Sequence, residues 1–400
     1  MKMIRSLGGA VLGLAILAIG CGGQSGADMV VSSDSALARA AASLLPDLVT
    51  RSGLPLKAHV RLEVRSREEL VRYLESKLDE DLPQEEAQAR VDVYARLGLV
   101  PHDLDLRAVL LGLYTEQVAG FYEPDSTALF VLDDQPEEAL HALLVHELVH
   151  ALQDQSADLG MLTDPAGGSD RAAAAQAAIE GHATLVMLEY MTEQMTGSPI
   201  DLGQIPDFSA QLRPALEGLS QFPALASAPR IIREALLFPY LEGAGYVQRL
   251  WVGGSRVAPF GANLPSSTEQ VMGPAEAPFE LELTVQGGRA VLEDVLGRFE
   301  LGIFLDEVVS PDLAFLSKGW DGDRYVLVEG VGGARSLVSF VVWSDRDTRD
   351  RFTDAVEGAR RALGTEVQVD RIDIAGRSAS VITIGPPAGV SVSARESRAR

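Results

Sequence analysis

The sequence predicts an α+β fold, in which a mainly helical region with a small antiparallel sheet precedes a smaller α+β domain. Three observations lead to this prediction. Apolar residues recur at helical spacing over most of residues 35–251. Residues 117–134 contain two short apolar runs on either side of Pro124 and Asp125, which is typical of a β-hairpin. From about residue 279, strand-like runs alternate with helical ones.

The helical region is expected to begin with a helix at residues 35–49, broken near Pro46, and a half-buried strand at residues 59–66. A helix that starts near Pro136 and ends at Gln155 follows the hairpin. The other expected helices cover residues 66–81, 83–99, 171–195 and 230–251.

A boundary near Pro278 divides the chain into a first domain of residues 36–277 and a second of residues 278–388. In the second domain we expect one amphipathic helix at residues 346–363. Alternating apolar residues predict strands at residues 279–285, 324–330, 337–343, 366–374 and 378–384. Residues 389–400 are expected to form a flexible tail.

Composition and charge limit the classes of function. Apolar residues make up 46% of the chain and charged residues 23%, as in ordinary folded proteins. The net charge is −23. Because such a surface repels a phosphate backbone, we expect no nucleic-acid partner.

Residues 1–20 have the pattern of a signal peptide. A short basic region precedes an uncharged stretch that is too short to span a bilayer comfortably. Cys21, the one cysteine of the chain, follows directly, and the segment resembles a bacterial lipobox, whose cysteine is lipidated. The alternative is a plain signal peptide with Cys21 incidental. We expect residues 21–35, rich in Gly, Ser and Asp, to be a flexible tether.

The segment from Leu143 to Gln155 contains an H-E-x-x-H motif formed by His146, Glu147 and His150. Residues four apart lie on one face of a helix, so both histidines can present a ring nitrogen to one metal ion. In this arrangement zinc takes the histidines and the glutamate acts as general base.

A catalytic zinc usually has three protein ligands and an open position. Glu180 is a carboxylate in a helix made largely of alanine, beside Gly181, and we expect it to be the third ligand. The small neighbours would let this helix approach the helix that carries the motif. His182 and His141 lie on other helix faces, and His182 is expected to be a packed or ligand-supporting residue.

The HELVH motif followed by an E-G-x-A helix resembles the gluzincin class of zinc metallopeptidases. The resemblance implies a zincin-like catalytic region with one Zn²⁺ per chain, His146, His150 and Glu180 as ligands, and Glu147 as base. It also implies an edge strand upstream of the motif helix that pairs with an extended substrate, for which residues 127–134 are the candidate.

More of the chain, from about Tyr114 onward, resembles an uncharacterised bacterial group of predicted metallopeptidases that are often exported. The resembling phrases include "YTEQVAGFYEPD", "VHELVHALQDQ", "EGHATLVMLEY" and "GWDGDRYVLVE". Thr184 departs from the pattern, because thermolysin-like enzymes carry there an acidic residue that orients a ligand histidine.

Such a peptidase also needs residues around the metal. A tetrahedral oxyanion requires a hydrogen-bond donor beyond the zinc. Four tyrosines are candidates, and the sequence does not rank them: Tyr122, Tyr190, Tyr240 and Tyr246. Ligand histidines are usually oriented by a further partner, for which Asp154 is the candidate.

These observations predict an exported, lipid-anchored zinc peptidase of the bacterial cell envelope that acts on a peptide or protein substrate. Which membrane holds the anchor is left open. One alternative is a non-catalytic envelope lipoprotein that uses the zinc helix pair as a structural or partner-binding module. Another is a relic site, with the second domain binding a partner.

Overall fold

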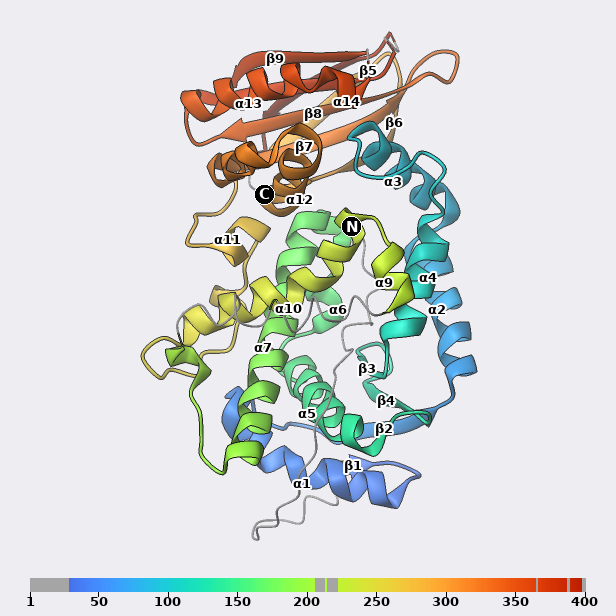
Figure 1. Cartoon of the computed structure of the whole chain (residues 1–400), viewed down its shortest axis with the longest axis vertical. Helices are drawn as coiled ribbons and strands as arrows, with labels where there is room; N and C mark the ends of the chain where they lie inside the picture. The colour runs from blue at the N-terminus through green and yellow to red at the C-terminus, as the bar shows by residue number, and fades with distance from the viewer. Residues whose placement is uncertain (1–28, 206–212, 214–221, 365, 387–388, 398–400) are drawn as a thin grey trace.

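The computed structural model describes residues 29–205, 213, 222–364, 366–386 and 389–397. Its elements form the α+β architecture that the sequence predicts. Figure 1 shows an elongated molecule with a C-terminal sheet at one end and a small N-terminal sheet towards the other. Long helices lie between the two sheets.

The N-terminal sheet has the strand order β1-β2-β4-β3. Its strands are β1 (Val30–Val31), β2 (Val60–Arg65), β3 (Gly120–Glu123) and β4 (Ala128–Leu132). β1, β2 and β4 pair in parallel, and only β3 runs antiparallel to its neighbour. The prediction of an antiparallel sheet was therefore wrong. Three helices between β2 and β3 return the chain across the sheet, so that β4 can enter parallel to β2.

Helices make up most of the region up to Met272. They are α1 (Ser35–Ser52), α2 (Arg67–Asp81), α3 (Gln84–Arg96), α4 (Leu106–Gln117), α5 (Glu137–Asp154), α6 (Leu159–Leu162), α7 (Ser169–Thr196), α9 (Pro223–Ser227), α10 (Arg230–Trp251) and α11 (Thr268–Met272). Short 3₁₀ helices are η2 (Pro165–Gly167), η3 (Leu202–Gln204) and η5 (Gly261–Asn263). The break expected near Pro46 is absent, because buried leucines on both sides of this proline hold α1 in the core.

The C-terminal sheet is antiparallel with the order β6-β7-β8-β10-β9. Its strands are β6 (Arg289–Asp294), β7 (Trp320–Glu329), β8 (Arg335–Trp343), β9 (Val367–Ile374) and β10 (Arg377–Ile384). The helical elements of this region are α12 (Gly297–Phe304), the π-helix η6 (Leu305–Val309), η7 (Pro311–Gly319), α13 (Arg346–Gly358) and α14 (Arg360–Leu363).

A two-stranded sheet packs on the C-terminal sheet through a separate apolar cluster. It pairs β5 (Leu281–Gln286) with β11 (Ser391–Glu396). The prediction of a flexible tail at residues 389–400 was therefore wrong for the strand that it contains. Val392 and Ala394 of β11 contribute to the apolar cluster, and this burial orders the strand.

The tether expected at residues 21–35 lies only partly within the described residues. Val30 is buried and pairs with Val60, and α1 begins at Ser35, so this end of the segment is ordered and that part of the prediction was wrong. The signal peptide and Cys21 lie outside the described residues. Among the residues that the structure describes, no helix has the length and apolar character needed to cross a membrane.

Two hydrophobic cores organise the molecule. One packs one face of the N-terminal sheet against the facing sides of α1, α5, α7 and α10. The other joins α2, α3 and α4 to α12 and one face of the C-terminal sheet. The two expected domains thus share a core, and a boundary near Pro278 stays a prediction.

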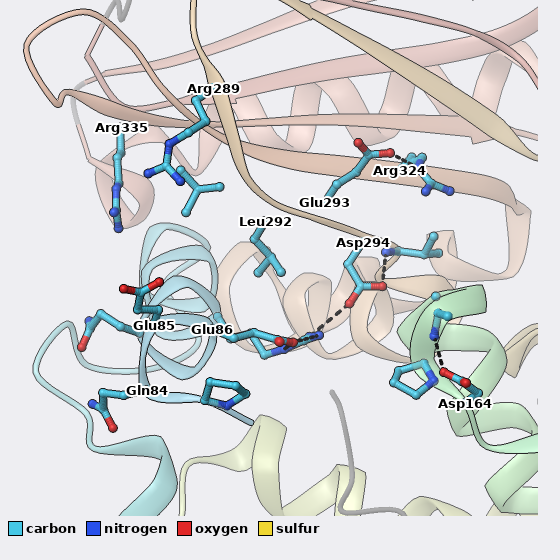
Figure 2. A pocket seen from close by; sticks show the side chains of 18 residues that line it. Gln84, Glu85, Glu86, Asp164, Arg289, Leu292, Glu293, Asp294, Arg324 and Arg335 are labelled. Atoms are coloured by element: carbon cyan, nitrogen blue, oxygen red, sulfur yellow. Dashed lines mark hydrogen bonds and ion pairs between the residues drawn. The ribbon is translucent and has the colours of Figure 1, made fainter. Parts of the chain in front are cut away.

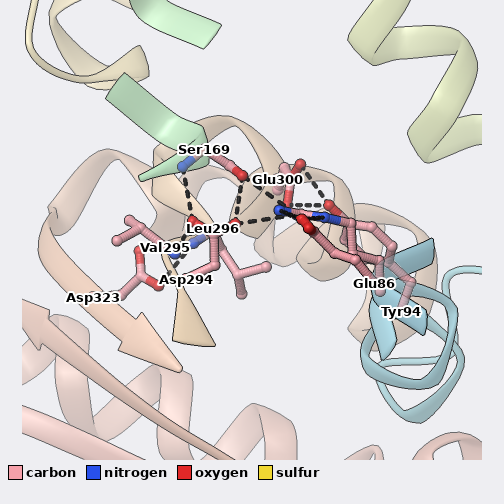
Figure 3. Close-up of polar contacts among 9 residues, drawn as sticks. Glu86, Tyr94, Ser169, Asp294, Val295, Leu296, Glu300 and Asp323 are labelled. Carbon is pink, nitrogen blue, oxygen red and sulfur yellow. Dashed lines mark hydrogen bonds and ion pairs between the residues drawn. The ribbon is translucent and has the colours of Figure 1, made fainter. Parts of the chain in front are cut away.

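Polar groups reinforce this junction (Figure 3). Arg90 on α3 lies 3.1 Å from Asp294 at the end of β6, and both side chains are buried. The backbone N–H of Ser169, the first residue of α7, donates to Asp294 at 2.7 Å. The C-terminal region therefore fixes the start of α7, the helix that carries Glu180.

Candidate metal centre

Helices α5 and α7 bring three side chains of the predicted site together. His146 Nε2 lies 3.1 Å from Glu180 Oε2, and His150 Nε2 lies 3.4 Å from the same oxygen. The two histidine Nε2 atoms are 3.0 Å apart. All three side chains are buried, and their ligating atoms lie within 4.8 Å of one another. His146, His150 and Glu180 could therefore hold a metal ion, as expected.

The charges of this cluster are strongly coupled. Burial is the largest single effect and by itself would raise the pKa of Glu180, but the hydrogen bonds and charges of His150 and His146 together outweigh it and lower the pKa to about 2. Burial is the largest single effect and lowers the pKa of His150, but Glu180, Glu147 and Gln153 together outweigh it and raise the pKa to about 9. Without a metal, the two residues thus form an imidazolium–carboxylate pair. A bound cation would replace the proton of His150.

Glu147 is fully buried next to His146 on α5, with 0% of its surface exposed. Neither of its carboxylate oxygens has a hydrogen-bond partner among the described residues. Burial raises its pKa to about 8. A buried carboxylate without a partner is costly, so this arrangement fits a site that is complete only with a cation and solvent.

A chain of hydrogen bonds extends from the back of His150. Its Nδ1 lies 2.8 Å from Gln153 Oε1. Gln153 Nε2 donates to Ile179 O at 2.9 Å and lies 3.1 Å from His182 Nδ1. His182 Nε2 lies 3.1 Å from Ser52 O. The expectation that His182 packs behind the ligands agrees with this position.

Asp154 was expected to be the residue that orients a histidine of the site. In the structure, Gln153 is the residue that contacts His150. Asp154 accepts from Tyr122 Oη at 2.8 Å and from Leu159 N at 3.1 Å, and neither of these bonds involves His146 or His150. Gln153 was missed, although its spacing of three from His150 places both on one helix face. Thr184 is buried and its hydroxyl has no partner among the described residues, so it does not orient a histidine.

Of the four candidate tyrosines, Tyr240 on α10 lies at the site. Its ring centroid is 6.4 Å from that of His146. Burial and the adjacent carboxylate of Glu180 hold its pKa well above the usual value. Tyr190 instead packs beside His141, with ring centroids 5.5 Å apart.

The other two tyrosines have partners of their own. Tyr246 donates to Asn263 O. The Tyr122 hydroxyl donates a hydrogen bond to Asp154. The backbone of Tyr122 lies near Glu147 and lowers the pKa of Glu147, which opposes the larger effect of burial.

Gly181 was expected to let α7 approach α5, but in the structure it lies against α10. A Cβ on Gly181 would lie 2.1 Å from the carbonyl carbon of Gly243 on α10, and one on Gly243 would lie 2.0 Å from Ala177 O. The small residues therefore allow α7 to touch α10 rather than α5. This backbone contact holds Tyr240 next to Glu180.

The strand beside the motif helix also differs from the expectation. β4, which contains most of the expected segment, lies inside the sheet between β2 and β3. β3 is the edge strand next to β4, and it lies against α5. An extended chain could pair with the sheet at β3, not at β4.

A cavity of about 1060 Å³ lies elsewhere, between α3 and β6 (Figure 2). The residues that line it do not include His146, His150 or Glu180. Its buried charges, Arg90 and Asp294, are paired with each other. The cavity thus offers no free buried charge for a ligand.

No protein-family model matches the chain, and neither a curated protein nor a solved structure matches it significantly. The functional interpretation therefore depends on the geometry of the site itself.

Proposed function

We propose that the protein is a zinc-dependent peptidase that hydrolyses peptide bonds. The observation that carries the proposal is a buried carboxylate, Glu147, without a partner among the described residues, beside three converging ligands. Two imidazole nitrogens and one carboxylate oxygen are the donor set of His₂Glu zinc peptidases. When bound, zinc would activate water and polarise the peptide carbonyl.

The chain's own residues have distinct tasks in this proposal. His146, His150 and Glu180 hold the metal, and Glu147 takes a proton from the attacking water and passes it to the leaving amine. The Tyr240 hydroxyl donates to the oxyanion of the tetrahedral intermediate, because it is the candidate tyrosine that adjoins the ligands. The free edge of β3 would align the substrate backbone.

The proposed location is the bacterial cell envelope, with Cys21 lipidated and the chain anchored by lipid. The basic and apolar pattern of residues 1–20 supports it. A peptide or protein is the proposed substrate and the membrane the proposed partner. The strongly acidic net charge of −23 argues against nucleic acid.

One observation favours a second function, a structural or partner-binding zinc site in a non-catalytic lipoprotein. His146 and Glu147 have 0% of their surface exposed and Glu180 has 1%. Structural zinc sites are closed, whereas catalytic sites keep an open position. The two proposals differ in what Glu147 does, because a structural zinc has no use for a general base.

The test uses the full-length protein in detergent, depleted of metal with a chelator and then given zinc. We expect about one zinc per chain by mass spectrometry and cleavage of peptides from a denatured-protein mixture. The Glu147→Gln variant should bind zinc equally and cleave nothing. Bound zinc with no cleavage by the wild type would favour the structural function, and folded protein that binds no zinc would contradict both.

A further inference from the structure

We infer that Gln153 and His182 form an uncharged orienting relay that selects the nitrogen His150 presents to the metal. The relay runs through three elements, from His150 and Gln153 on α5 to His182 on α7 and the carbonyl of Ser52 at the end of α1. Each of these four residues is buried. The inference deepens the proposed zinc site and needs only metal binding, not peptidase activity.

Two backbone carbonyls fix the direction of every hydrogen bond in the relay. Ile179 O can only accept, so the amide nitrogen of Gln153 must face it and donate at 2.9 Å. The amide oxygen of Gln153 then faces His150 Nδ1 at 2.8 Å, and this nitrogen must donate. His150 therefore keeps a proton on Nδ1, and the proton that a bound cation would replace is the one on Nε2.

The far end of the relay gives the same answer. Ser52 O can only accept, so His182 Nε2 donates to it at 3.1 Å. His182 Nδ1 faces the amide nitrogen of Gln153 at 3.1 Å and must accept. His182 is thus a neutral ring with its proton on Nε2, and it holds the Gln153 amide in one orientation.

The consequence for the metal is specific. With the proton on Nδ1, His150 presents the lone pair of Nε2, the atom that lies 3.0 Å from His146 Nε2 and 3.4 Å from Glu180. Ligand histidines are more often oriented by a carboxylate or a backbone carbonyl. Here an amide does the same work without adding a negative charge to a buried site that already holds Glu147 and Glu180.

The test measures zinc affinity of the full-length protein in detergent, by competition with a chelating indicator. We expect Gln153→Leu to weaken zinc binding by about 10- to 100-fold, the usual effect of losing an orienting partner. Gln153→Glu should retain only part of the affinity, because its carboxylate still accepts from Nδ1–H but cannot donate to Ile179 O or His182 Nδ1. Gln155→Leu is the matched control, since Gln155 bonds to the backbone of residues 57–58 and not to the site.

His182→Phe should weaken binding less than Gln153→Leu, and combining the two should add little, because both act through one chain of bonds. The ring of His182 packs edge-on against Trp251 with centroids 5.8 Å apart, so phenylalanine keeps the packing. Equal affinities of Gln153→Leu and wild type, or an equal loss in Gln155→Leu, would overturn the inference.

A second measurement needs no substitution. Nitrogen NMR of the protein labelled at histidine should show His150 protonated at Nδ1 and bound to zinc through Nε2. Binding through Nδ1 would overturn the relay while leaving the zinc site intact. A wild-type protein that binds no zinc would contradict both the proposed function and the relay. That result differs from zinc bound through Nδ1 of His150, which would contradict the relay alone.

Discussion

Arg90 and Asp294 form a buried ion pair at 3.1 Å that ties α3 to the first strand of the C-terminal sheet. Asp294 also accepts from Ser169 at the start of α7. Arg90→Met would leave Asp294 buried without its cation, and we expect a loss of about 3–5 kcal/mol in the free energy of unfolding. Urea unfolding followed by circular dichroism measures this loss.

Arg324→Met is the control for that prediction. Arg324 pairs with Glu293 near the same strand, but both side chains are about a third exposed. Exposed pairs contribute roughly 0–1 kcal/mol. Similar losses in the two variants would mean that the buried pair does not hold the junction.

The same junction should make stability depend on pH. Burial raises the pKa of Asp170 to about 7 from an ordinary value of 3.8. A carboxyl with a raised pKa binds its proton more tightly in the folded state than in the unfolded one. Its stabilising contribution is therefore complete below about pH 4 and is lost as the pH rises to about 7.

Asp170→Asn tests this dependence, because an amide oxygen can still accept the bonds that Asp170 receives from Thr268. The urea midpoint of the variant relative to that of the wild type should rise between pH 4.5 and pH 8. The underlying change in the free energy of unfolding is about 1.4 kcal/mol per unit of pKa shift. Parallel midpoints across this range would show that Asp170 titrates normally.

Glu180 is expected to be a metal ligand. Glu180→Ala should lower zinc affinity by more than the roughly 100-fold that an orienting residue can contribute, because it removes a donor atom. Isothermal titration of the metal-free full-length protein measures this. Glu193→Ala on the same helix is the control, since Glu193 pairs with Arg51 away from the site; equal weakening in both variants would argue against coordination by Glu180.

The contact between α7 and α10 should tolerate no side chain. Gly181→Ala would place a Cβ 2.1 Å from the carbonyl carbon of Gly243, so α7 and α10 must separate. We expect a loss of at least about 1–3 kcal/mol in stability, together with weaker zinc binding as Tyr240 and Glu180 shift. Gly358→Ala on α13 meets open space and should change neither quantity.

Tyr240 is proposed to act in the reaction and not in metal binding. Tyr240→Phe should reduce turnover by about 10²- to 10³-fold, as the loss of one oxyanion donor does elsewhere, while zinc content stays the same. Tyr246→Phe, which loses a bond to Asn263 on the far side of α10, should keep near-normal turnover. An unchanged rate in Tyr240→Phe would move the oxyanion role to another group.

Much of the local structure could be predicted because it depends on local periodicity. The helices around His146 and Glu180 follow from apolar spacing, and α5 and α7 match the expected ranges closely. The missed elements include strands β6 and β11 and helices α4 and α12. β11 is ordered by pairing with β5, a strand more than 100 residues earlier, and no local pattern encodes such a partner.

The amino-acid sequence by itself determined which three residues could hold a metal, because four-residue spacing on a helix and an isolated carboxylate in an alanine-rich helix are local features. Tertiary structure alone decided which neighbours complete the site. Gln153 rather than Asp154 reaches His150, Tyr240 rather than three other tyrosines adjoins Glu180, and β3 rather than β4 is an edge strand. These outcomes depend on how helices and strands that are distant in sequence pack together, and hydrogen bonds form only between side chains that packing brings within about 3 Å.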